Sequence, residues 1–301
     1  MTEYKQLMSL ADEIGCEYSI AESMRKHTTF RIGGPCDIML FPDNKQQATT
    51  VIKACRQMSL DYMVLGNGSD MVFGSGGYNG AVISMCRLNS IYVEGNRIYC
   101  DAGVSMSNLC NTALEHSLTG AERLYGIPGT VGGAVCMNAG AYGGQISDIL
   151  VSCDYFDGVE VTSRLTGELE LAYRHSIFSA GTMTVLSACF ELKSGDKAEI
   201  KATMDDCISR RRSKQPVEYP SAGSVFLRPE GHFAGALVEQ CGFKGYSVGG
   251  AEVSEKHCGF IINKGGATSS DVKALVNEIK QKVLDETGVS LQCEIKFVGE
   301  D

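Results

Sequence analysis

Several signatures of metal and disulfide chemistry are missing from this sequence. None of the 13 cysteines is spaced as Cys-x-x-Cys, their number is odd, and no His-Glu-x-x-His occurs. The five histidines show no metal-ligand spacing either. We therefore expect neither a metal site nor a disulfide framework. The cysteines are expected to act as small buried apolar residues in a reducing compartment.

Targeting signals and long apolar runs are also lacking. The N-terminus has no basic region followed by an apolar stretch, and no run of about 18 apolar residues exists anywhere. We expect a cytoplasmic protein without membrane insertion. The formal net charge is −9, which argues against nucleic acid as a partner because phosphate backbones attract basic surfaces. A locally basic pocket for a small anion is compatible with that charge.

The common motifs for phosphate binding and for serine nucleophiles are absent. No Gly-x-Gly-x-x-Gly opens a helix, and no Gly-x-x-x-x-Gly-Lys-Ser/Thr occurs, so the chain carries neither a Rossmann nor a P-loop signature. Ser224 stands in Ser-Ala-Gly-Ser-Val-Phe, which is not the Gly-x-Ser-x-Gly of a nucleophile elbow. Alone, this serine reads as a structural turn residue.

Two glycine-rich segments are the most informative features present. Gly66-Asn67-Gly68-Ser69-Asp70 follows a short apolar run, and residues 126–144 are both glycine-dense and apolar. Glycines among buried residues indicate that backbone approaches something closely. Backbone N–H groups in such loops bind anions without basic side chains. A phosphate-bearing cofactor site and tight turns in a crowded α/β core both remain open at this point.

The hydrophobic pattern predicts a mixed α/β chain. Helices are expected near 7–14, 45–58, 105–117 and 198–212, and strands near 62–65, 81–85 and 97–100. A further helix should start at Ser270 or Asp271 and end at Gly288. A final strand, 289–297, alternates apolar and polar residues. Glu294 therefore faces away from the core, toward solvent or toward a cleft.

Basic residues near a possible domain boundary allow two interpretations. Arg210, Arg211, Arg212 and Lys214 precede Gln215-Pro216. Cations suit the C-terminal end of a helix, and they also recognise diphosphates. Arg174, taken alone, reads as a surface residue.

Several long segments together resemble one family. Thr28 to Gly34, Val64 to Ser69 and Gly126 to Gly144 resemble the FAD-binding half of UDP-N-acetylenolpyruvoylglucosamine reductases. Tyr173-Arg174-x-Ser176-x-Phe178, Pro220 to Phe226 and Gly249 to His257 resemble the substrate half. The match runs from about residue 25 to the C-terminus, in family order. It is closest to the shorter subtype, without the extra loop that covers the substrate.

The resemblance implies a fold and a domain arrangement. The expected class is α+β, with the two-lobed FAD-binding fold of the vanillyl-alcohol-oxidase/PCMH-like type plus a smaller α/β substrate-binding domain. We expect FAD-binding lobes at 1–80 and 81–209 and a substrate domain at 210–294, with residues 295–301 packing back on the first lobe. A monomer is expected.

The resemblance also implies an activity and residue roles. NADPH would reduce bound FAD, and the flavin would reduce the enolpyruvyl group of the small-molecule substrate UDP-N-acetylenolpyruvylglucosamine. Arg174 and Glu294 would stabilise the enolate, and Ser224 would donate the proton. Substrate contacts are expected from Tyr173, Lys214 and Arg228. Cofactor contacts are expected from Arg31, Gly66, Asn67, Gly68, Ser69, Ile127, Pro128, Gly129, Thr130, Gly132, Gly133, Asn138, Gly140, Ala141 and Tyr142.

One departure and two alternatives accompany this reading. The family usually has Asn where Asp70 stands, and an anion there would disfavour a nearby pyrophosphate. An oxidase of the same fold is the first alternative, although residues 66–80 contain no histidine for covalent flavin attachment. A non-catalytic UDP-sugar-binding protein is the second, although Arg174, Ser224 and Glu294 are all retained.

Overall fold

The computed structural model describes residues 2–301, which form two compact units. Unit 1 comprises residues up to 20, 38–67 and 80–210, and unit 2 comprises 21–37, 68–79 and 211–301. No helix among the described residues is both long and apolar enough to cross a membrane. Ten of the 13 cysteines are buried, as expected for small apolar core residues.

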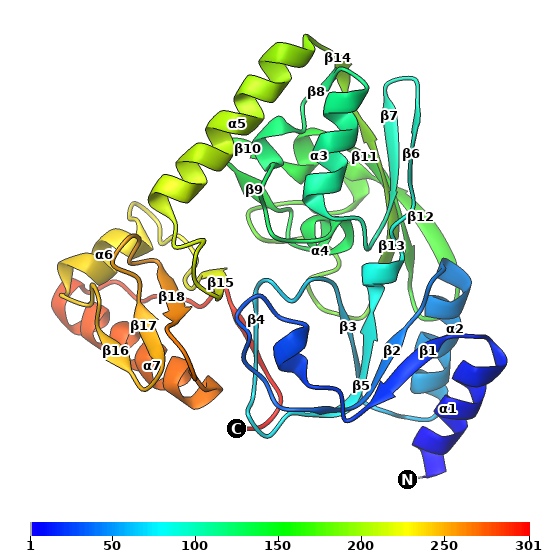
Figure 1. Ribbon diagram of the computed structural model, residues 1–301, viewed down its shortest axis with the longest axis horizontal. Coiled ribbons are helices and arrows are strands. Elements are labelled where there is room, and N and C mark those ends of the chain that lie inside the picture. Colours follow the sequence, from blue (N-terminus) through cyan, green and yellow to red (C-terminus); the bar gives the residue numbers. More distant parts are fainter. Residues whose placement is uncertain (1) are drawn as a thin grey trace. The chain divides into compact units, whose positions relative to one another are not determined.

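The first part of unit 1 is a four-stranded sheet covered by two helices (Figure 1). Strand β1 pairs with β2 in the antiparallel direction, whereas β3 runs parallel to β5. Leu7 and Ala11 of the first helix and Val51, Ile52 and Cys55 of the second lie in one buried cluster with this sheet. The elements are α1 (Thr2–Glu13), β1 (Glu17–Ile20), β2 (Cys36–Phe41), α2 (Lys45–Gln57), β3 (Tyr62–Leu65) and β5 (Tyr78–Ser84).

The second part of unit 1 is a five-stranded antiparallel sheet in the order β12-β11-β13-β7-β6. Helices α3 and α4 pack against β7 on one face. Its main elements are β6 (Ile91–Glu94), β7 (Arg97–Asp101), α3 (Met106–Glu115), α4 (Val131–Cys136), β11 (Leu150–Phe156), β12 (Val161–Leu165), β13 (Thr184–Glu191) and α5 (Lys197–Lys214). The short strands are β8 (Leu118–Thr119), β9 (Gly140–Ala141), β10 (Gly144–Gln145) and β14 (Lys193–Ser194).

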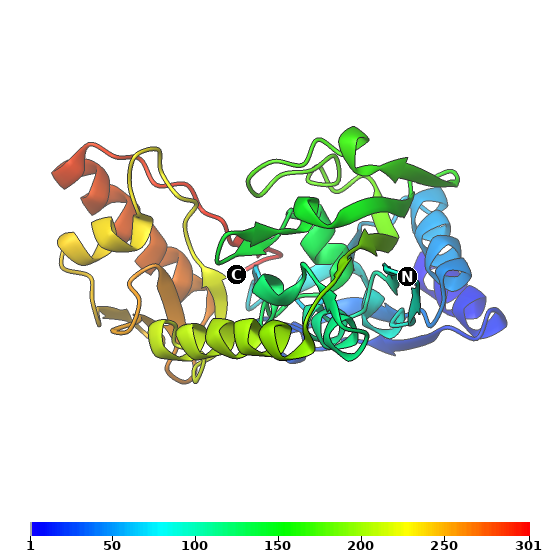
Figure 2. The ribbon, with the colours of Figure 1, turned by 90° about the horizontal axis from the view of Figure 1, so that it is seen from above.

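Unit 2 is built on a second antiparallel sheet, β15-β18-β17-β16, which packs with α6 and α7; Figure 2 shows these two helices side by side. A separate parallel pair joins the C-terminal strand β19 to β4. The elements are β4 (Met71–Phe73), β15 (Ser221–Ser224), α6 (Ala234–Gln240), β16 (Ser247–Val248), β17 (Ala251–Val253), β18 (Phe260–Asn263), α7 (Ser269–Thr287) and β19 (Lys296–Val298).

Two early segments of the chain belong to unit 2. Phe30, Ile32 and Val72 are buried in one cluster with the apolar face of α7, so residues 21–37 and 68–79 group with the C-terminal part. The sequence-based division instead placed all of 1–80 in one lobe. The boundary between units near the C-terminal end of α5, at 210/211, lies one residue from the expected start of the substrate domain. The three-lobe division itself stays a prediction.

Two local expectations are corrected by the structure. Helix α7 is capped by Thr268, whose hydroxyl accepts from the Asp271 N–H, and not by Ser270 or Asp271. Asp271 instead completes a capping box, while Gly288 ends the helix at φ 73° as expected. The final strand covers only Lys296–Val298 and not 289–297, because residues 292–294 pair only locally, with residues 225–227.

Candidate active site

The expected site residues are distributed over both units. Unit 1 carries the cofactor candidates Gly66, Asn67, Ile127, Pro128, Gly129, Thr130, Gly132, Gly133, Asn138, Gly140, Ala141 and Tyr142, together with Tyr173 and Arg174. Unit 2 carries Arg31, Gly68, Ser69, Lys214, Ser224, Arg228 and Glu294.

In unit 1 the two glycine-rich segments meet. Strand β3 leads directly into Gly66, and the Asn67 side-chain amide donates to the Pro128 carbonyl at 2.7 Å. A Cβ on Gly66 would lie 2.5 Å from the Thr130 hydroxyl oxygen. Thr130 is the N-cap residue of α4. Segments about 60 residues apart in the sequence are therefore packed directly against each other.

Residues 102–104 accept backbone hydrogen bonds from the second glycine-rich segment. The Gly132 N–H donates to the Ala102 carbonyl at 2.8 Å, and the Val131 N–H donates to the Val104 carbonyl at 2.7 Å. A Cβ on Gly132 would lie 2.9 Å from that of Ala102. Gly66 and Gly132 are thus glycines because protein packs closely on them.

Gly133 differs from these two glycines. It is exposed, and a Cβ there would meet only the Thr130 hydroxyl, at an ordinary 3.6 Å. Its backbone is open to an approaching molecule, whereas its neighbours are closed by protein. The Gly133 N–H donates to the Thr130 hydroxyl at 3.5 Å, so the open part of this residue is its Cα, where the missing side chain lets a bound molecule approach the backbone closely.

A tight hairpin presents Tyr142 at its tip. Strands β9 and β10 are joined by Tyr142 and Gly143, with φ 54° and 82°, the positive values typical of a two-residue turn. The Arg123 guanidinium donates to the Tyr142 carbonyl at 3.3 Å. The Arg210 guanidinium lies over the Tyr142 ring, 4.8 Å from its centroid. Two cations of unit 1 therefore contact this tyrosine, one at its carbonyl and one at its ring.

Arg174 occupies a second tight turn of unit 1. Ala172 and His175 exchange backbone hydrogen bonds, so Tyr173 and Arg174 are the central residues, and Arg174 has φ 55°. The guanidinium lies 5.1 Å from the centroid of the Tyr173 ring. The turn therefore presents the ring and the cation together.

Buried polar side chains anchor this turn. Asn138, only 2% exposed, donates to the Ala172 carbonyl at 3.1 Å, and the Ser176 hydroxyl donates to the Cys136 carbonyl at 2.6 Å. The Ser147 N–H donates to the Asn138 side-chain oxygen at 3.0 Å. Asn138 thus links the end of the glycine-rich segment to the Arg174 turn, and its expected contact with FAD stays a prediction.

In unit 2, Ser224 ends a strand that carries a bulge. The pairing of β15 with β18 shifts between Ser221 and Ser224, and Gly223 takes φ 76°. The Ser224 hydroxyl donates to the Phe226 carbonyl at 3.2 Å. A Cβ on Gly223 would lie 3.9 Å from the Ser69 carbonyl oxygen. The first glycine-rich loop therefore continues to a position beside the Ser224 segment.

Glu294 lies on the segment next to Ser224. Its N–H donates to the Val225 carbonyl at 2.8 Å, and the Leu227 N–H donates to the Gln292 carbonyl at 2.9 Å. Leu291 and Ile295 are buried, while Glu294 is half-buried. The expected orientation of Glu294, away from the apolar set, is consistent with this pattern. Two of the three candidate catalytic side chains are thus held on paired segments of one unit.

The first glycine loop is tied to the N-terminal segment of unit 2. The Thr29 N–H donates to the Gly68 carbonyl at 3.2 Å, and the Thr29 hydroxyl donates to the Ser221 carbonyl at 2.7 Å. A Cβ on Gly68, at φ 56°, would lie 2.3 Å from the His27 carbonyl oxygen. Arg31, also at positive φ (56°), is exposed beside this arrangement.

Asp70, the departure from the family pattern, lies beside the C-terminal strand. Its carbonyl accepts from the Lys296 N–H at 2.8 Å. Burial raises the pKa of the Asp70 carboxyl, and the nearby Lys296 ammonium partly opposes that rise. Burial of the ionised Asp70 carboxylate is therefore unfavourable, and a neutral Asn at this position would not incur that cost.

The two expected substrate cations of unit 2 are both exposed. Lys214 is the last residue of α5. Lys256 contacts the chain on both sides of it, donating to the Arg212 carbonyl and pairing with Glu218 at 2.8 Å. The Arg228 guanidinium lies 4.6 Å from the centroid of the Phe233 ring.

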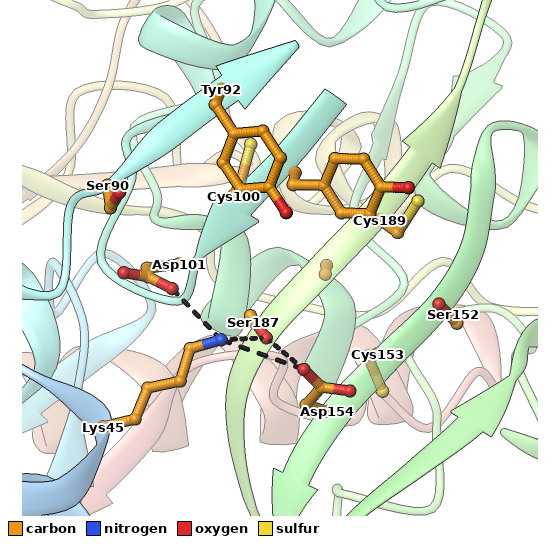
Figure 3. A pocket seen from close by; sticks show the side chains of 12 residues that line it. Lys45, Ser90, Tyr92, Cys100, Asp101, Ser152, Cys153, Asp154, Ser187 and Cys189 are labelled. Carbon is orange, nitrogen blue, oxygen red and sulfur yellow. Dashed lines mark hydrogen bonds and ion pairs between the residues drawn. The ribbon is translucent and has the colours of Figure 1, made fainter. Parts of the chain in front are cut away.

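A separate polar hollow of unit 1 lies between α2 and the five-stranded sheet (Figure 3). The Lys45 ammonium contacts Ser187 at 2.7 Å, Asp101 at 3.3 Å and Asp154 at 3.8 Å. Ser187 also donates to Asp154 at 2.8 Å. An ammonium has three donors, and three protein groups surround this one. The cluster therefore joins α2 to the sheet through one hydrogen bond and two ion pairs of Lys45.

Two family models match successive parts of this chain. Residues 36–170 match the model of an FAD binding domain, and residues 215–298 match that of the UDP-N-acetylenolpyruvoylglucosamine reductase C-terminal domain. The UDP-N-acetylenolpyruvoylglucosamine reductase of Clostridium novyi (strain NT) is 45% identical over 298 residues, covering 99% of this chain and 96% of the relative. This chain belongs to the UDP-N-acetylenolpyruvoylglucosamine reductase family.

Two further members of this reductase family support the assignment. The reductase of Clostridium perfringens (strain SM101 / Type A) is 43% identical over the full length of both chains. The crystal structure of the Thermus caldophilus reductase has a TM-score of 0.80 at 32% identity, covering 94% of this chain and 98% of that chain. The family resemblance and the expected fold class are thereby confirmed.

Sequence reasoning missed several residues that build the site. Arg123 donates to the Tyr142 carbonyl, and Phe233 lies against Arg228. The basic cluster of the sequence includes Arg210, but no pattern indicates its contact with the Tyr142 ring. Arg228 and Phe233 are only five residues apart, yet their contact depends on the turn between them.

Proposed function

We propose that this chain catalyses the reductase reaction of its family: NADPH reduces FAD, which in turn reduces the enolpyruvyl ether of UDP-N-acetylglucosamine to UDP-N-acetylmuramate for peptidoglycan synthesis. The observation that carries this proposal is the 45% identity over nearly the whole of both chains. The chain is an FAD-dependent oxidoreductase, and neither alternative, an oxidase or a non-catalytic binding protein, is favoured by any comparison.

The cofactor's place is supported by the glycine-rich segments. Bound FAD would supply the hydride-transfer chemistry between NADPH and the enolpyruvyl double bond. Asn67, Thr130 and Gly133 of unit 1 would hold it through the packed pair of loops. The space beside the Gly133 Cα supports a close approach of the cofactor to the backbone.

Arg174 is proposed to stabilise the negative charge that hydride addition places on the substrate carboxylate. A guanidinium keeps its charge at all working pH values and forms paired hydrogen bonds with a carboxylate. The anchored turn supports this role, because Asn138 fixes its backbone before substrate arrives. Such preorganisation is what electrostatic stabilisation of a transition state requires.

Ser224 is proposed to donate the proton that completes the reduction. Its hydroxyl donates to the Phe226 carbonyl, two residues past the end of its strand, and a bound substrate can replace that carbonyl as the acceptor. Glu294, on the paired segment, is proposed to assist Arg174 at the enolate by holding or sharing a proton. Lys214, Arg228 and Tyr173 are proposed to bind the diphosphate and sugar.

Two further statements belong to the proposal. The chain is proposed to act in the cytoplasm, where NADPH and nucleotide-activated sugars are available. It is proposed to act as a monomer, since each expected role is filled by a residue of this one chain.

An anaerobic spectrum tests the overall reaction. The flavin absorbance should bleach on adding NADPH and return on adding the UDP-enolpyruvyl sugar. Recovery only after admitting air would indicate the oxidase, and a colourless protein that rejects FAD would remove the cofactor assignment.

Ser224→Ala tests the proton-donor role separately. We expect NADPH to reduce the flavin at nearly the parental rate while turnover falls by about 10²–10⁴-fold, the usual contribution of a positioned acid. Ser221→Ala, in the same strand, is the matched control and should retain turnover. Parental turnover by the Ser224 variant would show that another group supplies the proton.

A further inference from the structure

An exposed aromatic ring in unit 2 lies against one of the proposed substrate cations. Phe233 is 64% exposed, the highest value among the large apolar side chains of unit 2 that are exposed. Water contact with so much apolar surface is unfavourable. The ring is also not part of the buried cluster formed by Ala234, Leu237 and Val238 of α6. Core packing therefore does not explain its position.

Arg228 occupies one face of this ring. The guanidinium carbon lies 4.6 Å from the ring centroid, within the distance at which cation–π attraction acts. The two residues flank a tight turn: the His232 N–H donates to the Pro229 carbonyl at 3.1 Å, and Gly231 takes φ 71°. The turn folds the chain back on itself and brings the two side chains together.

Both ends of the turn are fixed to the core of unit 2. Leu227, next to Arg228, donates to the Gln292 carbonyl at 2.9 Å. The Phe233 carbonyl accepts from the N–H groups of Ala236 and Leu237 at 3.0 and 3.1 Å, as the N-cap residue of α6. Thus the ring is a fixed platform, and it limits the orientations that the long Arg228 side chain can adopt.

We infer that Phe233 is a positioning residue for Arg228 in substrate binding. Its ring holds the guanidinium plane in place, so that the N–H groups meet the anionic diphosphate of the UDP-sugar without first losing side-chain entropy. This inference rests on the proposed function, specifically on Arg228 as a diphosphate ligand. Phe233 itself need not touch the substrate.

The test is a KM-against-kcat comparison in a set of Phe233 variants. For Phe233→Leu, which keeps apolar bulk but loses the π face, we expect KM for the UDP-enolpyruvyl sugar to rise about 2–5-fold, the range for an exposed cation–π contact. The kcat should be unchanged. Phe233→Tyr should restore the parental KM. Because the ring is exposed, the melting temperature of all variants should stay near that of the parent.

A double-mutant cycle with Arg228→Ala identifies the route of the effect. If Phe233 acts through Arg228, Phe233→Leu should change KM no further in the Arg228→Ala background. Tyr246→Leu removes another exposed ring of unit 2, one that packs on Phe243 and not on an arginine, and should leave KM unchanged.

Three results would overturn the inference and leave the proposed function intact: an unchanged KM in Phe233→Leu, an equal change in Phe233→Tyr, or additive effects in the cycle. A parental enzyme that shows no turnover of the UDP-sugar at all would instead remove the proposed function.

Discussion

Gly66 should be intolerant of a single added methyl group, for a reason that one other residue can relieve. In Gly66→Ala the new Cβ would lie 2.5 Å from the Thr130 hydroxyl oxygen, well inside van der Waals contact. Gly66 has no positive φ, so alanine fits the backbone and the cost is steric alone. Overpacking of this kind costs about 1–3 kcal/mol.

The clash in Gly66→Ala should be relieved at the expense of a helix cap. Rotation of the Thr130 hydroxyl would remove the clash, but this hydroxyl is the N-cap acceptor of α4. Losing such a cap costs about 0.5–2 kcal/mol of stability. Thr130→Ala alone should therefore destabilise by about that amount. In this background the next-nearest atom to the Gly66 methyl is the residue-130 Cβ, at an ordinary 3.5 Å. Adding Gly66→Ala should then cost almost nothing.

The measurement is a double-mutant cycle on the free energy of unfolding of the FAD-free protein, followed by FAD retention after gel filtration. We expect a favourable coupling of about 1–2 kcal/mol between the substitutions. In the FAD-loaded protein, Gly66→Ala should also release cofactor more readily, because the shifted segment is the proposed cofactor contact. Additive costs, or a Gly66→Ala protein as stable as the parent, would show that the two loops are not packed as described.

Two further substitutions test the cofactor face and the family departure. Gly133→Ala should stabilise the FAD-free protein by about 0.5–1 kcal/mol, since the site is helical and open, yet weaken FAD binding measured by fluorescence titration; unchanged FAD affinity would place the cofactor elsewhere. For Asp70, a folded-state pKa raised by burial means that its contribution to stability is full below the unfolded value of about 3.9 and is lost as pH rises through the folded value. Asp70→Asn should therefore raise the melting temperature near pH 7, with the gain vanishing toward pH 4; a loss near pH 7 would mean that attraction to Lys296 outweighs burial.

Local pattern was sufficient for much of the fold. The spacing of apolar residues predicted α2 to within one residue at its C-terminal end. It also predicted β3 with the observed bounds, because both segments are strongly patterned. The α7 cap was misplaced because Thr268 and Asp271 form one reciprocal motif, and only the first of the two is the cap. The final strand was overextended because alternation reports which side chains are buried and not whether a partner strand is present.

The contacts that build the candidate site could be predicted less well from the sequence pattern. Glycine density correctly marked segments of close approach, but it did not separate Gly66 and Gly132, which are closed by protein, from Gly133, which is open. That distinction depends on Thr130 and Ala102, which are remote in sequence from at least one of these glycines. Likewise, the neighbours of Arg228 and Tyr142 follow from turns and helix ends whose spatial meeting no spacing rule encodes. Family resemblance supplied the residue roles that physics alone left open.

Backbone strain gives an independent indication of which positions matter. Among residues 2–301, eight non-glycine residues have positive φ, and four of them are Arg31, Asn138, Tyr142 and Arg174. All four were selected as site residues without knowledge of their backbone. Glycine adopts this conformation without the steric cost that a side chain incurs. At Tyr142 and Arg174, each in a two-residue turn, the chain keeps a large side chain where glycine would fold more easily. Strain of this kind persists where the surrounding structure holds it, and it is frequent at functional sites, in keeping with the roles proposed for the ring and the guanidinium.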